Sequence, residues 1–112
     1  MPTRELIAAS STPLVLSILA EGDNYGYAII QRVLELTSEE VEWTEGMLYP
    51  VLHRLERDGQ ISSEWRQAES GRERKYYRLT PQGRQDLKSH RADWLLIHNA
   101  LGQLWKLPPI ST

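Results

Sequence analysis

The chain has 112 residues, of which 40% are hydrophobic and 25% charged, a composition typical of one modest globular domain. It contains no cysteine, which excludes disulfides, thiolate metal sites and a cysteine nucleophile. No apolar run approaches the roughly 20 residues that span a bilayer, and the amino terminus lacks a signal-peptide pattern, so we expect a cytoplasmic protein with no membrane partner.

The net charge of -2 is unfavourable for nucleic-acid binding, but the charges are unevenly distributed. Residues 1–43 carry two basic and seven acidic side chains, whereas residues 79–112 carry four basic and two acidic ones. The segment 72–78 has four basic side chains against one acidic side chain. Any contact with DNA is therefore expected to be local.

The first part of the chain predicts two helical segments. Residues 6–9 favour a short helix. The tripeptide Ser-Thr-Pro at 11–13 then indicates a new start, because a hydroxyl residue followed by proline is typical of a helix amino terminus. Residues 14–19 are almost entirely apolar and are expected to be buried, and residues 21–24 have the composition of a turn.

Two further helices are expected, over residues 25–36 and from Thr44 onward. We expect the acidic segment 39–43 between them to pair briefly as an extended strand. Thr44 is the expected cap of the third helix, Pro50 is expected to bend it slightly, and Gly59 supplies a left-handed residue after its end. The inward side chains of this helix are expected to be Met47, Leu48, Val51, Leu52 and Leu55.

Two strand-like runs, 61–66 and 75–79, flank a polar loop at 67–73. Thr80-Pro81 then starts a helix that can run to about Leu107, before Pro108-Pro109 ends it. This order predicts a mainly α fold with a small β-hairpin. We expect a winged helix-turn-helix domain over residues 1–80, a long C-terminal dimerisation helix over 81–107 and a tail at 108–112.

Three stretches in this order resemble the PadR family of transcription regulators. GMLYPVLHRLERDG at 46–59 is similar to the family's recognition helix, YGYAI at 25–29 to the opening of its second helix, and GRERKYYRLT at 71–80 to its wing. The resemblance covers roughly residues 14–80, and the single C-terminal helix resembles the compact branch with multidrug-sensing members. It implies a dimeric repressor that binds double-stranded operator DNA. Met47 and Glu73 depart from the pattern, since a small hydroxyl residue and an uninterrupted basic run are usual there.

The recognition helix supplies the first candidate DNA contacts. An aromatic side chain in a helix usually packs into the core, but Tyr49 lies at the edge of the apolar face, and the resemblance places this tyrosine at the DNA surface. Thr44, Glu45 and Gly46 open the same helix, where backbone N–H groups can hold a phosphate and Glu45 can accept from cytosine.

Tyr25 and Tyr27 open the second helix, where a tyrosine hydroxyl can reach a phosphate, although a place in the core is equally open for Tyr27. Arg72, Arg74 and Lys75 form a basic run that by itself indicates only a solvated surface. On a wing that follows a helix-turn-helix, such cations are expected to contact the DNA backbone.

The long helix carries a heptad pattern of about three repeats. Leu87, Trp94 and Leu101 recur at a spacing of seven, and His90, Ile97 and Leu104 follow each of them by three. Packing onto the chain's own core is the alternative, but a helix that trails a complete winged-helix domain favours a second subunit. The expected dimer interface comprises Leu87, Trp94, Ile97, Leu101 and Leu104.

Two interpretations of Trp94 stay open. It is either an ordinary interface residue or, as the resemblance to multidrug-sensing members implies, one of a pair of tryptophans that hold a flat aromatic effector across the dimer. Ile97 and His98 would then lie beside the effector. Asp86 and Asp93 are close in sequence, so the charge of the effector is open.

No enzyme is indicated. The three histidines, His53, His90 and His98, lack the spacing of a metal site, and no phosphate loop or catalytic serine context is present, so we expect no metal and no cofactor. Two other functions stay open. One is a winged-helix module that binds a protein and not DNA, which the net charge, Glu45, Met47 and Glu73 favour. The other is a drug-binding protein without a regulatory role.

Overall fold

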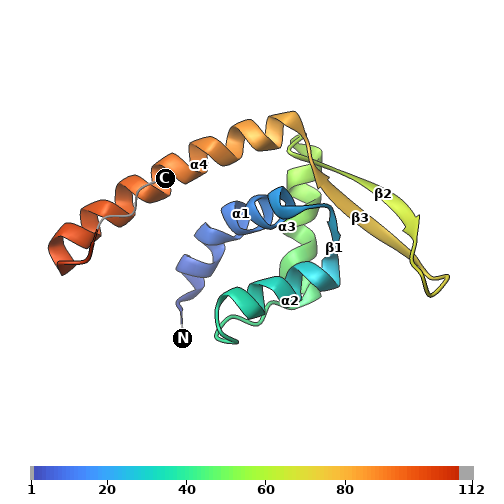
Figure 1. The fold of residues 1–112 in the computed structure, drawn as a ribbon, viewed down its shortest axis with the longest axis horizontal. Coiled ribbons are helices and arrows are strands. Elements are labelled where there is room, and N and C mark those ends of the chain that lie inside the picture. Colours follow the sequence, from blue (N-terminus) through green and yellow to red (C-terminus); the bar gives the residue numbers. More distant parts are fainter. Residues whose placement is uncertain (1, 109–112) are drawn as a thin grey trace.

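A computed structural model describes residues 2–108 (Figure 1). It contains three helices, a hairpin and a long C-terminal helix, which confirms the predicted winged helix-turn-helix with an added helix. The expected tail at 108–112 lies outside the described residues apart from Pro108. The elements are α1 (Arg4–Glu21), β1 (Asn24–Tyr25), α2 (Gly26–Leu36), α3 (Glu45–Arg57), β2 (Ile61–Gln67), β3 (Glu73–Leu79) and α4 (Pro81–Trp105).

The first helix is continuous, so the predicted break before Pro13 is wrong. Pro13 lies inside α1, where its missing N–H removes one backbone hydrogen bond. The hydroxyls of Ser10 and Ser11 donate to carbonyls of the preceding turn, at 2.7 Å to Leu6 O and 2.9 Å to Ala8 O. Because the buried face runs unbroken from Ser11 to Leu19, packing stabilises the helix across the proline.

The segment between α2 and α3 is not a strand, which corrects the expectation for residues 39–43. Ser38 and Glu39 adopt left-handed backbone conformations, with φ of 51° and 68°, and they turn the chain. Val41 and Trp43 then point into the core. The indole Nε1 of Trp43 is buried and has no hydrogen-bond partner among residues 2–108.

The extra strand pairing occurs instead at Asn24–Tyr25, directly before α2. These residues pair with Tyr77 and Tyr76 of β3, so the sheet has three antiparallel strands in the order β1-β3-β2. The hairpin of β2 and β3 forms the wing, which projects from the body in Figure 1.

The core lies between the first three helices and the base of the wing. As predicted, α3 buries Leu48, Leu52 and Leu55 against α1 and α2, with Val51 half-buried. Met47 is exposed, which corrects its predicted inward position. The fully formed core comprises Val15, Leu16, Ile18, Leu19, Ile29, Val33, Val41, Trp43, Leu48, Leu52, Leu55, Ile61, Tyr77 and Leu79.

The fourth helix is fixed tightly at its start. The Thr80 hydroxyl caps it by accepting from Gly83 N at 3.0 Å and also donates to Gly59 O at 2.6 Å. Gly83 packs so closely that a Cβ there would lie 2.0 Å from the carbonyl oxygen of Gln60. Both the capping role of Thr80 and the left-handed conformation of Gly59, with φ of 77°, agree with the sequence predictions.

We call the contact of Thr80 and Gly83 with Gly59 and Gln60 the joint. From this joint α4 passes along α1 and extends beyond the body (Figure 1). It ends at Trp105, two residues before the predicted end, because Lys106 adopts a left-handed conformation and its N–H bonds to Gly102 O. Within residues 2–108, no helix combines the length and apolar character needed to cross a membrane.

Candidate nucleic-acid interface

One groove collects most of the predicted DNA contacts. It lies between the amino-terminal ends of α2 and α3 on one side and the outer half of the wing on the other. Seven of the nine predicted residues line it, while Thr44 and Gly46 lie at the start of α3 without lining it. The lining residues are Tyr25, Gly26, Tyr27, Glu45, Tyr49, Trp65, Arg72, Glu73, Arg74 and Lys75.

Tyr49 is held in place by a glycine of the neighbouring helix. Its ring is half-buried against the core, and a Cβ on Gly26 would lie 2.6 Å from its hydroxyl oxygen. The absence of a side chain at Gly26 therefore lets the tyrosine lie across the start of α2. The Thr44 hydroxyl accepts from Met47 N at 3.3 Å, so it serves as the cap of α3.

The two tyrosines at the start of α2 differ. Tyr27 is 55% exposed, which removes the core alternative for this residue. Tyr25 is half-buried between two wing residues, with the Arg74 guanidinium 4.4 Å from its ring centroid and the Tyr76 ring at 5.4 Å edge to face. Tyr25 therefore positions Arg74 as well as lining the groove.

The cations of the wing fall into two groups. Two of them pair with Asp23, which directly precedes β1: Arg66 at 2.7 Å and Arg78 at 3.4 Å. The hydrogen bond from Arg66, aided by the charge of Arg78, lowers the pKa of the Asp23 carboxyl below its ordinary value.

The other three cations, Arg72, Arg74 and Lys75, have no ion-pair partner within residues 2–108. Positive charge is thus left available in the groove, where Glu45 and Glu73 partly offset it. This is the local basic surface that the charge distribution predicts.

Trp65 was not predicted as a site residue, yet it is 66% exposed and lines the groove. It stands directly across the hairpin from Lys75. The sequence contained a signal for it, since a tryptophan in a strand of otherwise polar residues has little core to pack against.

The predicted dimer interface on α4 divides into two parts. Leu87 is half-buried against the chain's own core, so it already has a packing partner. Trp94, Ile97, Leu101 and Leu104 are exposed, Leu104 by 77%. The outer part of the helix therefore presents an apolar surface that the described part of the chain does not cover.

The predicted effector residues do not all converge. Trp94 lines a groove of about 590 Å³ between α1 and α4, whereas Ile97 lines a separate shallow hollow with Asp93 and Trp94. His98 is half-buried and lines neither of these two hollows. Over residues 2–108, no three histidine or acidic side chains come together as a metal site.

Comparisons with known proteins agree on one family. The model of the transcriptional regulator PadR-like family matches residues 15–89. Transcriptional regulator Rv3488 of Mycobacterium tuberculosis is 39% identical over 88 residues, which cover 79% of this chain and 78% of that protein.

Solved structures agree as well. A transcriptional regulator from Clostridium thermocellum superposes with a TM-score of 0.82 at 32% identity, over 92% of this chain and 97% of that chain. A PadR family transcription regulator from Clostridium difficile superposes with a TM-score of 0.76 at 34% identity, over 86% and 98% of the two chains.

Proposed function

The chain belongs to the PadR-like family of transcriptional regulators, and from this premise we propose that it is a homodimeric repressor of transcription that a small ligand releases from its operator. Family membership makes it a regulator and not an enzyme. The observation that carries the proposal is the single groove in which α2, α3 and the wing present Tyr27, Tyr49 and three unpaired cations together.

In this proposal the start of α3 enters the major groove and the wing follows the backbone. Tyr49 lies at the amino-terminal end of α3, where a recognition helix contacts base edges, and Arg72, Arg74 and Lys75 displace counterions from the phosphates. Tyr25 orders Arg74 beforehand, which reduces the entropy lost on binding.

The homodimer is supported by the exposed apolar side chains on the outer part of α4. A contiguous apolar surface of this kind is typical of an interface, and Trp94, Ile97 and Leu101 follow the heptad spacing of a helix pair. A two-fold dimer would place two copies of α3 on half-sites about one helical turn of DNA apart.

Release by a ligand is supported by the groove beside Trp94. Its volume of about 590 Å³ lies within the range of small-molecule sites. A ligand between the long helices of the dimer would lower operator affinity if it preferred the arrangement that does not bind DNA.

Fluorescence anisotropy tests the DNA-binding proposal. The protein is titrated onto its own upstream intergenic DNA and onto scrambled DNA across a salt series. We expect preference for the first and an affinity that falls steeply with salt. Equal and weak binding to both DNAs would instead favour a winged-helix module that binds a protein, which Glu45 and Glu73 in the groove also allow.

The double variant Arg72→Ala/Arg74→Ala tests the wing. We expect weaker binding to both DNAs and a plot of log affinity against log salt that is shallower by about 2, because two phosphate contacts are lost. Arg57→Ala/Lys106→Ala removes the same charge from outside the groove and should keep the original slope. Equal slopes for the two double variants would contradict a role of the wing in DNA binding.

A further inference from the structure

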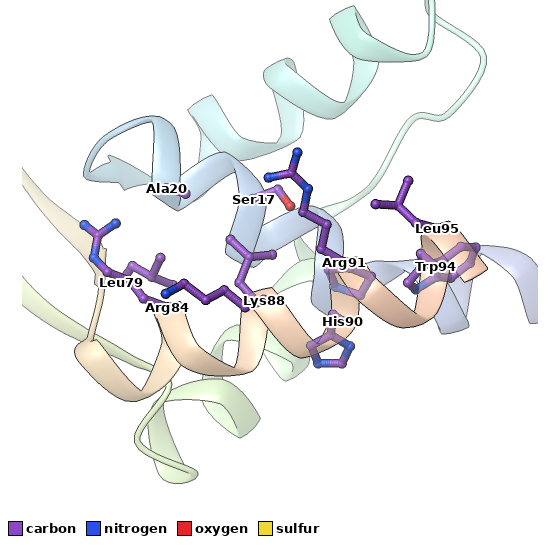
Figure 2. Close-up of a pocket in the computed structure, with 11 residues that line it drawn as sticks. Ser17, Ala20, Leu79, Arg84, Lys88, His90, Arg91, Trp94 and Leu95 are labelled. Carbon is purple, nitrogen blue, oxygen red and sulfur yellow. The ribbon is translucent and has the colours of Figure 1, made fainter. Parts of the chain in front are cut away.

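The chain contains four tryptophans, and three of them belong to features already described. Trp43 is buried in the core, Trp94 lies in the groove between α1 and α4 (Figure 2), and Trp105 ends the apolar outer part of α4. Trp65 is different, because it is 66% exposed on a wing strand whose next neighbours are Glu64 and Arg66. Water would be released from this large ring if a binding partner covered it.

Trp65 continues a row of side chains that begins in the core. Because side chains alternate along a strand, Ile61, Ser63 and Trp65 lie on the same face of the wing. Ile61 is buried, and the hydroxyl of Ser63 donates to the carboxylate of Glu56 on α3, so this is the face toward α3. The next side chain of the row, Trp65, lines the groove together with Tyr49 of α3. The indole therefore faces the space between the recognition helix and the wing.

The neighbour of Trp65 across the hairpin is a cation. Lys75 is its partner in the strand register, and the Cβ atoms of such partners lie about 5 Å apart on the same face. The ammonium group of Lys75 lies 5.7 Å from the ring centroid of Tyr77. Within residues 2–108, no aromatic ring stacks on Trp65 and no cation lies over it. An uncovered apolar ring and an unpaired positive charge therefore lie side by side in the groove.

The backbone of DNA presents matching chemistry in alternation, an anionic phosphate followed by a sugar with apolar C–H groups. We propose that Trp65 packs against a deoxyribose of the DNA strand that passes between α3 and the wing, while Lys75 contacts the adjacent phosphate; the inference rests on the DNA binding proposed above. A sugar contact carries no base sequence and neutralises no phosphate. Trp65 therefore adds affinity for any DNA sequence, and its contribution does not depend on salt in the way that a cation's does.

A protein partner is the other macromolecule that an exposed tryptophan can bind, but the surroundings of Trp65 favour DNA. The centre of a protein interface is typically apolar and poor in charged residues. Three cations and two carboxylates line the groove around Trp65, and the other exposed aromatic side chain there, Tyr27, carries a hydroxyl group. One flat ring among unpaired cations fits a charged backbone better than an apolar protein surface.

The affinity test uses Trp65→Thr, because threonine suits a strand and removes the ring. Fluorescence anisotropy on the upstream intergenic DNA and on scrambled DNA should show a dissociation constant raised roughly tenfold on both, the effect of losing one large aromatic contact. The slope of log affinity against log salt should stay the same, in contrast to Arg72→Ala/Arg74→Ala. Trp65→Phe keeps a ring and should recover most of the affinity.

Three results would overturn the sugar contact. An unchanged affinity of Trp65→Thr would show that the ring does not touch DNA. A loss on the upstream DNA alone would show that it contacts bases. A loss with a slope as shallow as that of Arg72→Ala/Arg74→Ala would show that it only positions the cations.

Leu36→Ala is the matched control. It removes another exposed apolar side chain, at the opposite end of α2 from Tyr25 and Tyr27 and outside the groove, so affinity and slope should both stay unchanged. Circular dichroism checks that every variant folds. If Leu36→Ala weakened binding as much as Trp65→Thr, the loss would not come from a contact in the groove, and the proposal would fall.

A spectroscopic signature separates contact from a structural role. The full chain labelled with 5-fluorotryptophan gives fluorine NMR resonances of its tryptophans, and the resonance of Trp65 is the one absent from Trp65→Phe. Saturating DNA should shift this resonance and reduce its sensitivity to exchange of H₂O for D₂O, while the resonance of buried Trp43 stays in place. A Trp65 resonance that stays fully sensitive to solvent in the complex would overturn the proposal.

The unaltered chain, measured on the same DNAs, separates this inference from the proposed function. If it binds neither DNA, the proposed regulator function and the sugar contact both fall. If it binds with the expected steep salt dependence and Trp65→Thr binds equally well, only the sugar contact falls.

Discussion

In the body of the molecule, from α1 to the first turn of α4, fourteen apolar side chains form one closed core. In the arm, which we define as residues 94–105 of α4, the larger apolar side chains are mostly exposed, and Gly102 is the one buried residue within this range. Apolar side chains of similar types therefore have different surroundings in the body and in the arm. Those of the body are covered by the chain itself, while those of the arm need a surface that residues 2–108 do not supply.

The largest expected effect comes from breaking the joint that fixes the start of α4 to the rest of the body. In Gly83→Ala the new methyl group would lie 2.0 Å from Gln60 O and 2.8 Å from Leu79 Cδ1. The backbone at Gln60 would have to shift to make room, which disturbs the packing around it. We therefore expect a loss of about 3 kcal/mol in the free energy of unfolding, measured by urea titration.

Gly102→Ala is the control for this prediction. A methyl group there would meet Leu107 O at 3.7 Å, which is ordinary contact, so the better helix propensity of alanine should add about 0.5–1 kcal/mol. If the two substitutions had similar effects, the tight packing at Gly83 would not be what fixes α4.

A somewhat smaller effect is expected from charging the arm. Ile97→Lys/Leu101→Lys should raise the dissociation constant of the proposed dimer by roughly 100-fold, because each new lysine would place a positive charge in an apolar interface. Analytical ultracentrifugation measures the change, and circular dichroism should show that the body stays folded.

The matched control is Gln103→Lys, which adds a charge at an exposed position of the arm outside the heptad pattern. It should leave the dimer intact. An unaltered dimer in the double variant would mean that the second subunit packs elsewhere, and the contrast between a self-covered body and an uncovered arm would need another explanation.

The smallest effect concerns the ion pairs, which within residues 2–108 belong to the body and its wing. The pKa of Asp23 is lowered from 3.8 by Arg66, so its carboxylate stabilises the fold above that pH and loses its effect as the pH falls through the lowered pKa. Asp23→Asn should cost less than about 1 kcal/mol at pH 7, since the pair is partly exposed.

Urea titrations at pH 7 and at low pH check this prediction. The difference between Asp23→Asn and the original chain should shrink as the carboxyl becomes protonated. Asp93→Asn on α4 has no ion pair to lose within the described residues and should show no such dependence. A difference for Asp23→Asn that persists unchanged in acid would show that its charge is not what ties the wing to the body.

Much of the fold could be predicted because its boundaries are local. Thr44 and Thr80 cap the helices that follow them, and Gly59 supplies the left-handed turn, since each depends on a few neighbouring residues. The continuous α1 could not be predicted in this way. Pro13 favours a helix start by itself, and only packing of the whole buried face outweighs that preference.

In the candidate site, too, local signals could be predicted from the sequence, whereas contacts between distant segments could not. Tyr49 and the basic run of the wing could be found from sequence because their residue types and positions carry the signal. The two-residue strand β1 has no periodicity to detect, and its pairing with Tyr76 depends on contacts across the fold. The stacking of Tyr25 on Arg74 could be found only once that pairing was known, whereas the polar residues around Trp65 in β2 already indicate its exposure.

The joint at Thr80 has a mechanical consequence. A single residue separates β3 from α4, and it is bonded to Gly59 and Gln60 in the turn that ends α3. The helix beyond it has 25 residues and is therefore about 37 Å long, so a tilt of about 5° moves its far end by roughly 3 Å. The pivot of α4 is therefore built from the turn that ends α3, and we expect a small displacement at the tip of α4 to be coupled to a small rotation of α3.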